Sequence, residues 1–103
     1  MDIFIYNFDY IRLRWDQLEQ LNYPILTGRF ASSKLVNDLS ELFLLLGIKN
    51  SVQLNRSNER YNKTYLISAV TISGYKRLSK YLKLIGFNNP KNIRKLKNGP
   101  NGI

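Results

Sequence analysis

The chain has 103 residues, of which 44% are apolar, and a formal net charge of +9. This length suits one domain with one core, and the apolar content indicates a globular protein. The sequence contains no cysteine and no histidine, which excludes disulfide bonds, thiolate metal sites and Ser-His or Cys-His catalysis.

The sequence carries no signal for a membrane or for secretion. The longest strongly apolar stretch, Leu42 to Ile48, is too short to span a bilayer. The amino terminus opens with Asp2 and not with the basic residues of a signal peptide. We therefore expect a soluble intracellular protein with no membrane partner.

The basic charge is concentrated in the second half of the chain. Residues 1–48 hold four cations against six anions, a net charge of −2, whereas residues 49–103 hold twelve cations against Glu59 alone, a net charge of +11. Clustered cations gain free energy by displacing the counterions condensed on a polyanion. The asymmetry predicts a nucleic acid as partner, and the alternative is a basic surface that only solvates the protein.

The segment from Asp9 to Leu21 allows two interpretations. As a helix it places apolar residues on one face, and as a strand it pairs Ile11 with Leu13. The polar residues of its second half are poor strand formers, and Pro24 soon afterwards supplies a stop. We therefore expect a helix here, preceded by a short strand at Ile3–Tyr6.

The clearest element is a leucine-rich helix that follows a short strand at Ile25–Ala31. A serine hydroxyl, of Ser32 or Ser33, can accept a hydrogen bond at its start, and Gly47 suits the left-handed residue that ends a helix. Its apolar residues recur at spacings of three and four: Leu35, Leu39, Leu42, Phe43 and Leu46. This pattern predicts a core helix.

Residues 50–73 have the pattern of a β-hairpin. We expect strands at Ser51–Asn55 and Thr64–Ile72, joined by the polar run Arg56–Lys63. Strand alternation then places Gln53 and Asn55 on one face.

A second amphipathic helix is expected after Gly74. Its apolar residues point inward, namely Tyr75, Leu78, Leu82 and Ile85, and its lysines line the outer face, namely Lys76, Lys80 and Lys83. After Pro90, a basic run predicts a short helix: Lys91, Arg94, Lys95 and Lys97.

Four of these features, in this order and spacing, resemble the latter part of a LAGLIDADG homing endonuclease of the intein and archaeal-intron type. They are the serine-capped leucine-rich helix at 32–48, the basic hairpin, Ile-Ser-Gly at 72–74, and Ile-Gly-Phe-Asn-Asn-Pro-Lys at 85–91. The resemblance spans residues 25–97.

The resemblance implies an α+β fold in which a curved antiparallel sheet lies across the DNA major groove and helices pack on its other face. We expect a single such domain over residues 1–97 and a flexible tail at 98–103. Strand residues that face away from the helices, with lysines of the following helix, would contact double-stranded DNA: Arg29, Gln53, Asn55, Arg56, Arg60, Lys63, Tyr65, Lys76 and Lys80. The residue types agree, because arginine and lysine donate to guanine and glutamine and asparagine bond adenine.

The signature motif of that family is not found. The motif is a helix that joins the two halves of the enzyme and ends in an acidic residue near glycine, which binds the divalent metal for strand cleavage. Asp2, Asp9 and Asp16 are not followed by that glycine. We therefore assign no metal site, with Mg²⁺ as cofactor only if the chain is an active nuclease. In the family a lysine near the metal helps to organise water, and Lys91 is the matching position.

Three explanations of the missing motif stay open. The chain is the C-terminal piece of a longer or split endonuclease, a decayed reading frame, or a binding domain that does not cleave. The first explanation implies pairing with a missing N-terminal half, and a homodimer is an alternative. Two other functions also remain: an RNA-binding, maturase-like splicing factor, and a non-catalytic interaction protein that uses the leucine-rich helix.

Overall fold

Four strands and three helices make up the described residues of the computed structural model, which are 8–18, 21–60 and 63–98. In chain order they are β1 (Arg12–Leu18), β2 (Leu21–Phe30), α2 (Ser33–Leu45), β3 (Ser51–Arg60), β4 (Lys63–Ser73), α3 (Tyr75–Leu84) and α4 (Pro90–Asn98). The strands form one antiparallel sheet in the order β1-β2-β4-β3. The predicted α+β class is therefore confirmed. The strand predicted at Ile3–Tyr6 and residues 99–103 of the predicted tail lie outside the described residues, whereas residue 98 ends α4.

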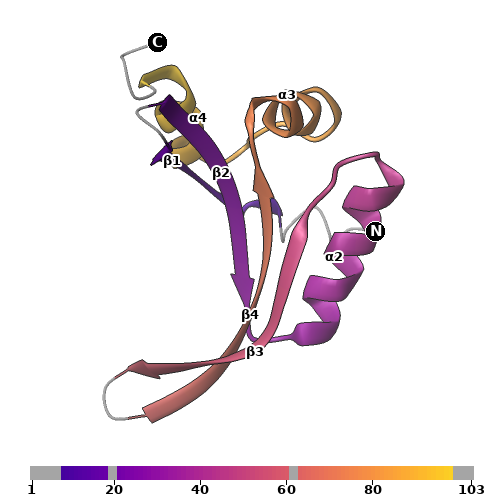
Figure 1. Ribbon diagram of the computed structural model, residues 1–103, viewed down its shortest axis with the longest axis vertical. Coiled ribbons are helices and arrows are strands. Elements are labelled where there is room, and N and C mark those ends of the chain that lie inside the picture. Colours follow the sequence, from indigo (N-terminus) through magenta and orange to yellow (C-terminus); the bar gives the residue numbers. More distant parts are fainter. Residues whose placement is uncertain (1–7, 19–20, 61–62, 99–103) are drawn as a thin grey trace.

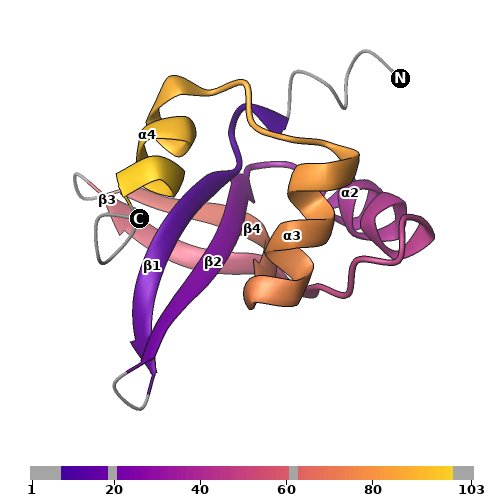
Figure 2. The same cartoon turned by 90° about the horizontal axis from the view of Figure 1, so that it is seen from above.

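Helices α2 and α3 cover one face of the sheet, and α4 lies against the edge strand β1. Helix α2 packs on β3 and β4, α3 on β2 and β4, and α4 on β1 (Figure 1). Seen from above, α4 lies beside β1, and α3 and α2 follow toward the other end of the molecule (Figure 2). Between sheet and helices lies one core of buried side chains: Ile11, Leu13, Leu26, Val36, Leu39, Phe43, Ile48, Val70, Ile72, Leu78 and Tyr81.

Helix α2 has the ends that its sequence predicts. The Ser32 hydroxyl accepts a hydrogen bond from the Leu35 amide at 3.1 Å, as an N-cap residue does. At the other end, Gly47 has a φ of +78°, and the Ile48 amide donates to the Phe43 carbonyl at 2.7 Å. This 6→1 bond closes the helix with a left-handed glycine.

The prediction of a helix at residues 9–21 is wrong, because residues 12–18 form β1 and Leu21 begins β2. Ile11 and Leu13 are both buried, as in the strand interpretation, and β1 pairs with β2 along its whole length. Burial of alternate residues in a paired strand outweighs the low strand propensity of Asp16 and Gln17. Pro24 does not act as a stop and lies within β2. Its carbonyl accepts from the Gly74 amide at 3.0 Å, where the β2–β4 ladder ends, so the missing N–H costs no ladder bond.

The hairpin is longer than expected. The strand predicted at 25–31 and both hairpin strands exist, but residues 56–60 continue β3 instead of forming a loop. A β-bulge lies between Gln53, which pairs with Ala69, and Arg56, which pairs with Ile67. Two residues of β3 thus face one residue of β4, and the second of the two, Asn55, has a φ of +54°.

Helix α3 is present, but Tyr75 does not point inward. Its side chain is 53% exposed, whereas Tyr81 is fully buried. Helix α3 begins at the rim of the sheet, so Tyr75 meets the Trp15 ring, with centroids 6.0 Å apart, instead of the core.

Helix α4, also expected, covers the outer edge of β1. The Asn92 side chain, which is 1% exposed, accepts from the Leu13 amide at 3.0 Å and donates to the Ile11 carbonyl at 2.6 Å. The Trp15 indole donates to the Lys95 carbonyl at 3.0 Å. One amide side chain thus satisfies two of the backbone groups that this edge of the sheet would otherwise leave free.

Candidate nucleic-acid interface

The face of the sheet opposite the helices, which we call the open face, gathers the central residues predicted from sequence. Arg29 and Gln53 both pair with Ala69, from the two neighbouring strands, and Arg56 pairs with Ile67. Because directly paired residues share a face, all three polar side chains emerge together. They line a shallow hollow of about 190 Å³ with Ser57, Ile67 and Ala69.

The bulge decides which residue joins Gln53 on the open face. Uninterrupted alternation would place Asn55 beside Gln53 and turn Arg56 to the helices. The extra residue restores Arg56 to the face of Gln53. Asn55 itself lies at the bulge, where its backbone amide donates a hydrogen bond to the Ser68 hydroxyl at 2.9 Å.

Strand β1 adds two arginines that the sequence analysis did not assign. Arg12 pairs with Thr27 and Arg14 with Ile25, so both lie on the open face. The Arg12 guanidinium donates to the Asp9 carbonyl. The Arg14 guanidinium lies 3.8 Å from the Asp16 carboxylate, and both side chains are more than half exposed.

Alternation was the signal that could have found them. In the run Ile-Arg-Leu-Arg at 11–14, apolar and basic residues alternate. Such a pattern is typical of a strand with one buried and one charged face. Because a helix was predicted for this segment, its two arginines were not assigned to a face of the sheet.

The projecting end of the hairpin continues the open face. Lys63, Tyr65 and Ile67 alternate along β4, so they share a side of the strand, and Tyr65 is 46% exposed. Arg60 pairs with Lys63, but its side chain lies outside the described ones. Asp16 is the one acidic side chain that the register places on the open face among the described residues.

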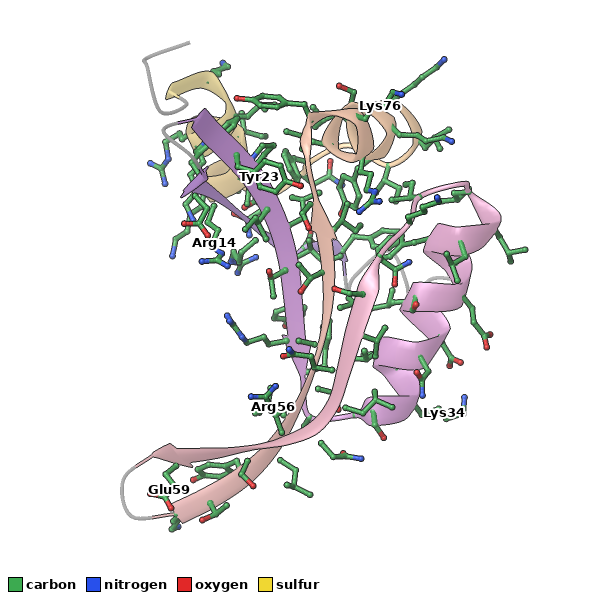
Figure 3. All side chains as sticks on the ribbon, viewed as in Figure 1. Arg14, Tyr23, Lys34, Arg56, Glu59 and Lys76 are labelled. Atoms are coloured by element: carbon green, nitrogen blue, oxygen red, sulfur yellow. The ribbon has the colours of Figure 1, made fainter. Side chains whose placement is uncertain are left out.

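Two predicted residues lie elsewhere. Lys76 and Lys80 are on α3, on the helical side of the sheet, whereas Arg14 and Arg56 point from its opposite side (Figure 3). The Lys80 ammonium donates to the Gly47 carbonyl at 3.0 Å. The structure therefore does not bring these lysines together with the open face.

The described residues do not fit a divalent metal site. Lys91 lies exposed in the first turn of α4, and its amide donates to the Asn89 side chain at 2.9 Å. No three acidic side chains gather near it or elsewhere in residues 8–18, 21–60 and 63–98. Metal-assisted hydrolysis needs converging carboxylates, so we derive no cleavage step from these residues.

No protein-family model matches the chain, and no curated protein matches it. No helix in the described part of the chain is long and apolar enough to cross a membrane. The resemblance to LAGLIDADG homing endonucleases therefore stays a prediction.

Proposed function

We propose that the chain is a LAGLIDADG-like DNA-binding domain that holds double-stranded DNA on its open face. The observation that carries this proposal is the set of four arginines that share that face, Arg12, Arg14, Arg29 and Arg56, with Asp16 as the one described carboxylate among them. Arginines on one face attract a polyanion, and Gln53 among them offers the donor and acceptor pair that reads adenine.

The shape of the sheet supports a duplex as ligand. The molecule measures 39 × 33 × 25 Å, and the sheet curves toward its open side, with the β3–β4 hairpin projecting beyond the helices (Figure 1). The major groove of B-DNA is about 12 Å wide and admits a two-stranded ribbon. The hairpin would enter this groove while the arginines of β1 and β2 contact the backbone beside it.

RNA is the second candidate, because tyrosines accompany the arginines on the open face. Tyr23 pairs with Asp16 there, and Tyr65 is exposed nearer the hairpin end. Aromatic rings of this kind stack on unpaired bases, but the major groove of an RNA duplex is too narrow for a ribbon. RNA binding would therefore require single-stranded loops.

The test is the affinity of the chain for duplex DNA over a series of salt concentrations. We expect a steep fall in affinity with salt, because the phosphate contacts release counterions. Replacing Arg29 and Arg56 by glutamine, the open-face variant, removes two such contacts. At 0.15 M salt this should weaken binding about 30-fold. The slope of log affinity against log salt concentration should become less steep by about 1.8.

A control variant separates these contacts from net charge. Lys34→Gln with Lys83→Gln removes the same two charges from exposed positions on α2 and α3. It should change the affinity much less than the open-face variant does. Equal losses in the two variants, or binding that ignores salt, would refute the proposal. Stronger competition by an RNA hairpin loop than by duplex DNA would favour the second candidate.

A further inference from the structure

A second basic site lies on the helical side, away from the open face. Between the end of α2 and the start of α3 there is a groove of about 580 Å³, which we call the basic groove. Its lining consists of one glycine and four cationic residues: Gly47, Lys49, Lys76, Arg77 and Lys80. Four positive charges around one hollow create a local field that favours an anion.

The cations of the basic groove are not matched by acidic side chains. Both ion pairs among the described residues lie elsewhere, between Arg14 and Asp16 and between Lys34 and Asp38. Lys80 is held by the Gly47 carbonyl, which keeps its ammonium at the groove. Within the described part of the chain, the other three cations form no hydrogen bond through their side chains, so their donors are available.

Helix stability does not explain the position of these cations. The Lys80 ammonium reaches from α3 to the C-terminal end of α2, where a positive charge is favourable. Lys76 and Arg77, however, are in the first turn of α3, at its positive end, and no acidic residue accompanies them. Cations at a helix start are unfavourable by some tenths of a kcal/mol each. Such positions suggest that the two side chains serve a ligand.

We propose that the basic groove binds a phosphate group. Lys76 and Arg77 supply charge from α3, Lys49 lines the groove from the segment before β3, and the Lys80 ammonium is held by the Gly47 carbonyl. Lys49 is two residues from Ser51, which pairs with Thr71 on the open face. The groove therefore lies at the end of the sheet where β3 begins, and a duplex that extends beyond this end of the open face would offer it a backbone phosphate. This assignment of the phosphate to the DNA backbone rests on the proposed function.

The first arm of the test uses duplex DNA and a groove variant, Lys76→Gln with Arg77→Gln. Loss of one phosphate contact should weaken binding about five-fold at 0.15 M salt. The slope of log affinity against log salt concentration should become less steep by about 0.9. The control variant at Lys34 and Lys83 removes equal charge and should keep nearly the wild-type affinity. Neither variant should have a Tm far below that of the wild type, which separates a lost contact from a lost fold.

The second arm uses inorganic pyrophosphate without DNA, followed by NMR of backbone amides. Saturable shifts at Gly47, Lys49 and Arg77 in the wild type, absent in the groove variant, would show a phosphate site. If only this arm succeeds, the phosphate comes from a small molecule and not from DNA. If neither arm distinguishes the groove variant from the control, the groove proposal is overturned, while DNA binding by the open face is unaffected. If the wild type binds no DNA, the proposed function fails and pyrophosphate alone decides the groove.

Discussion

The two faces of the sheet come from the same four strands but carry opposite chemistry. On the covered face, Leu13, Leu26 and Ile72 meet in one row across three strands and are almost fully buried. On the open face, the adjacent row runs from Arg12 through Thr27 to Thr71. Since successive residues alternate in direction, every second position contributes to stability and the others remain available for a ligand.

This division predicts that stability and binding can be altered separately. A change on the covered face should alter the free energy of unfolding, and a change on the open face should alter the affinity for DNA. At the edge strand β1 and at the bulge in β3, stability and DNA affinity depend on the same backbone.

The largest effect is expected for Phe43→Ala on the covered side. Phe43 is fully buried, and its ring lies 6.0 Å from the rings of both Phe8 and Tyr81. Truncation should lower the free energy of unfolding by about 3–5 kcal/mol, measured by urea denaturation. Leu45→Ala, on the same helix at 85% exposure, should change it by no more than about 0.5 kcal/mol. Similar losses in both would contradict the assigned core.

Asn92→Ala should couple the two faces. It leaves the Leu13 amide and the Ile11 carbonyl buried without a partner, at a cost of about 2–4 kcal/mol. Hydrogen exchange at the Leu13 amide should accelerate. Because β1 also carries Arg12, DNA affinity should fall too, although Asn92 is not on the open face. Unchanged affinity with accelerated exchange would show that β1 contributes no contact to DNA.

Helix α2 could be predicted from sequence because its signals are local. Ser32, Gly47 and the apolar spacing between them lie within one short segment and agree with one another. Strand β1 could not, because its partner β2 and the Asn92 side chain that covers its edge lie elsewhere in the chain. Local propensity alone therefore favoured a helix.

The residues of the candidate site could be predicted only where the strands that carry them were predicted. Arg29 and Gln53 were found because their strands were expected, whereas Arg12 and Arg14 were missed with β1. The bulge has no distinct sequence signal, since one inserted residue leaves both neighbouring runs of alternation intact. Its consequence, which is that Arg56 shares the face of Gln53, follows only from the pairing with β4.

Tyr81→Phe should stabilise the covered side. The Tyr81 hydroxyl is buried and has no hydrogen-bond partner among the described residues, so its removal should add about 1 kcal/mol. Burial, and secondarily the charge of Asp9, raise the pKa of Tyr81 well above its ordinary value.

The same group predicts a pH dependence. Above a pH of about 10, unfolded Tyr81 loses its proton while the folded side chain keeps it, so wild-type stability falls by up to about 1.4 kcal/mol per pH unit. Below that pH the group adds no slope. Denaturation curves between pH 8 and about 11 should show the loss in wild type and in the exposed control Tyr75→Phe, but reduced in Tyr81→Phe. Identical slopes in all three would contradict the buried hydroxyl.

The smallest effect is expected at the bulge. Asn55 has a φ of +54°, which asparagine and glycine tolerate better than other residues. Asn55→Gly should therefore change stability by no more than about 0.5 kcal/mol, whereas Asn55→Ala should cost about 1 kcal/mol. Because the glycine variant keeps the bulge, Arg56 stays on the open face and DNA affinity should hold. If alanine is tolerated as well as glycine, the left-handed residue is not required. If glycine weakens DNA binding without loss of stability, the Asn55 side chain itself contacts the ligand.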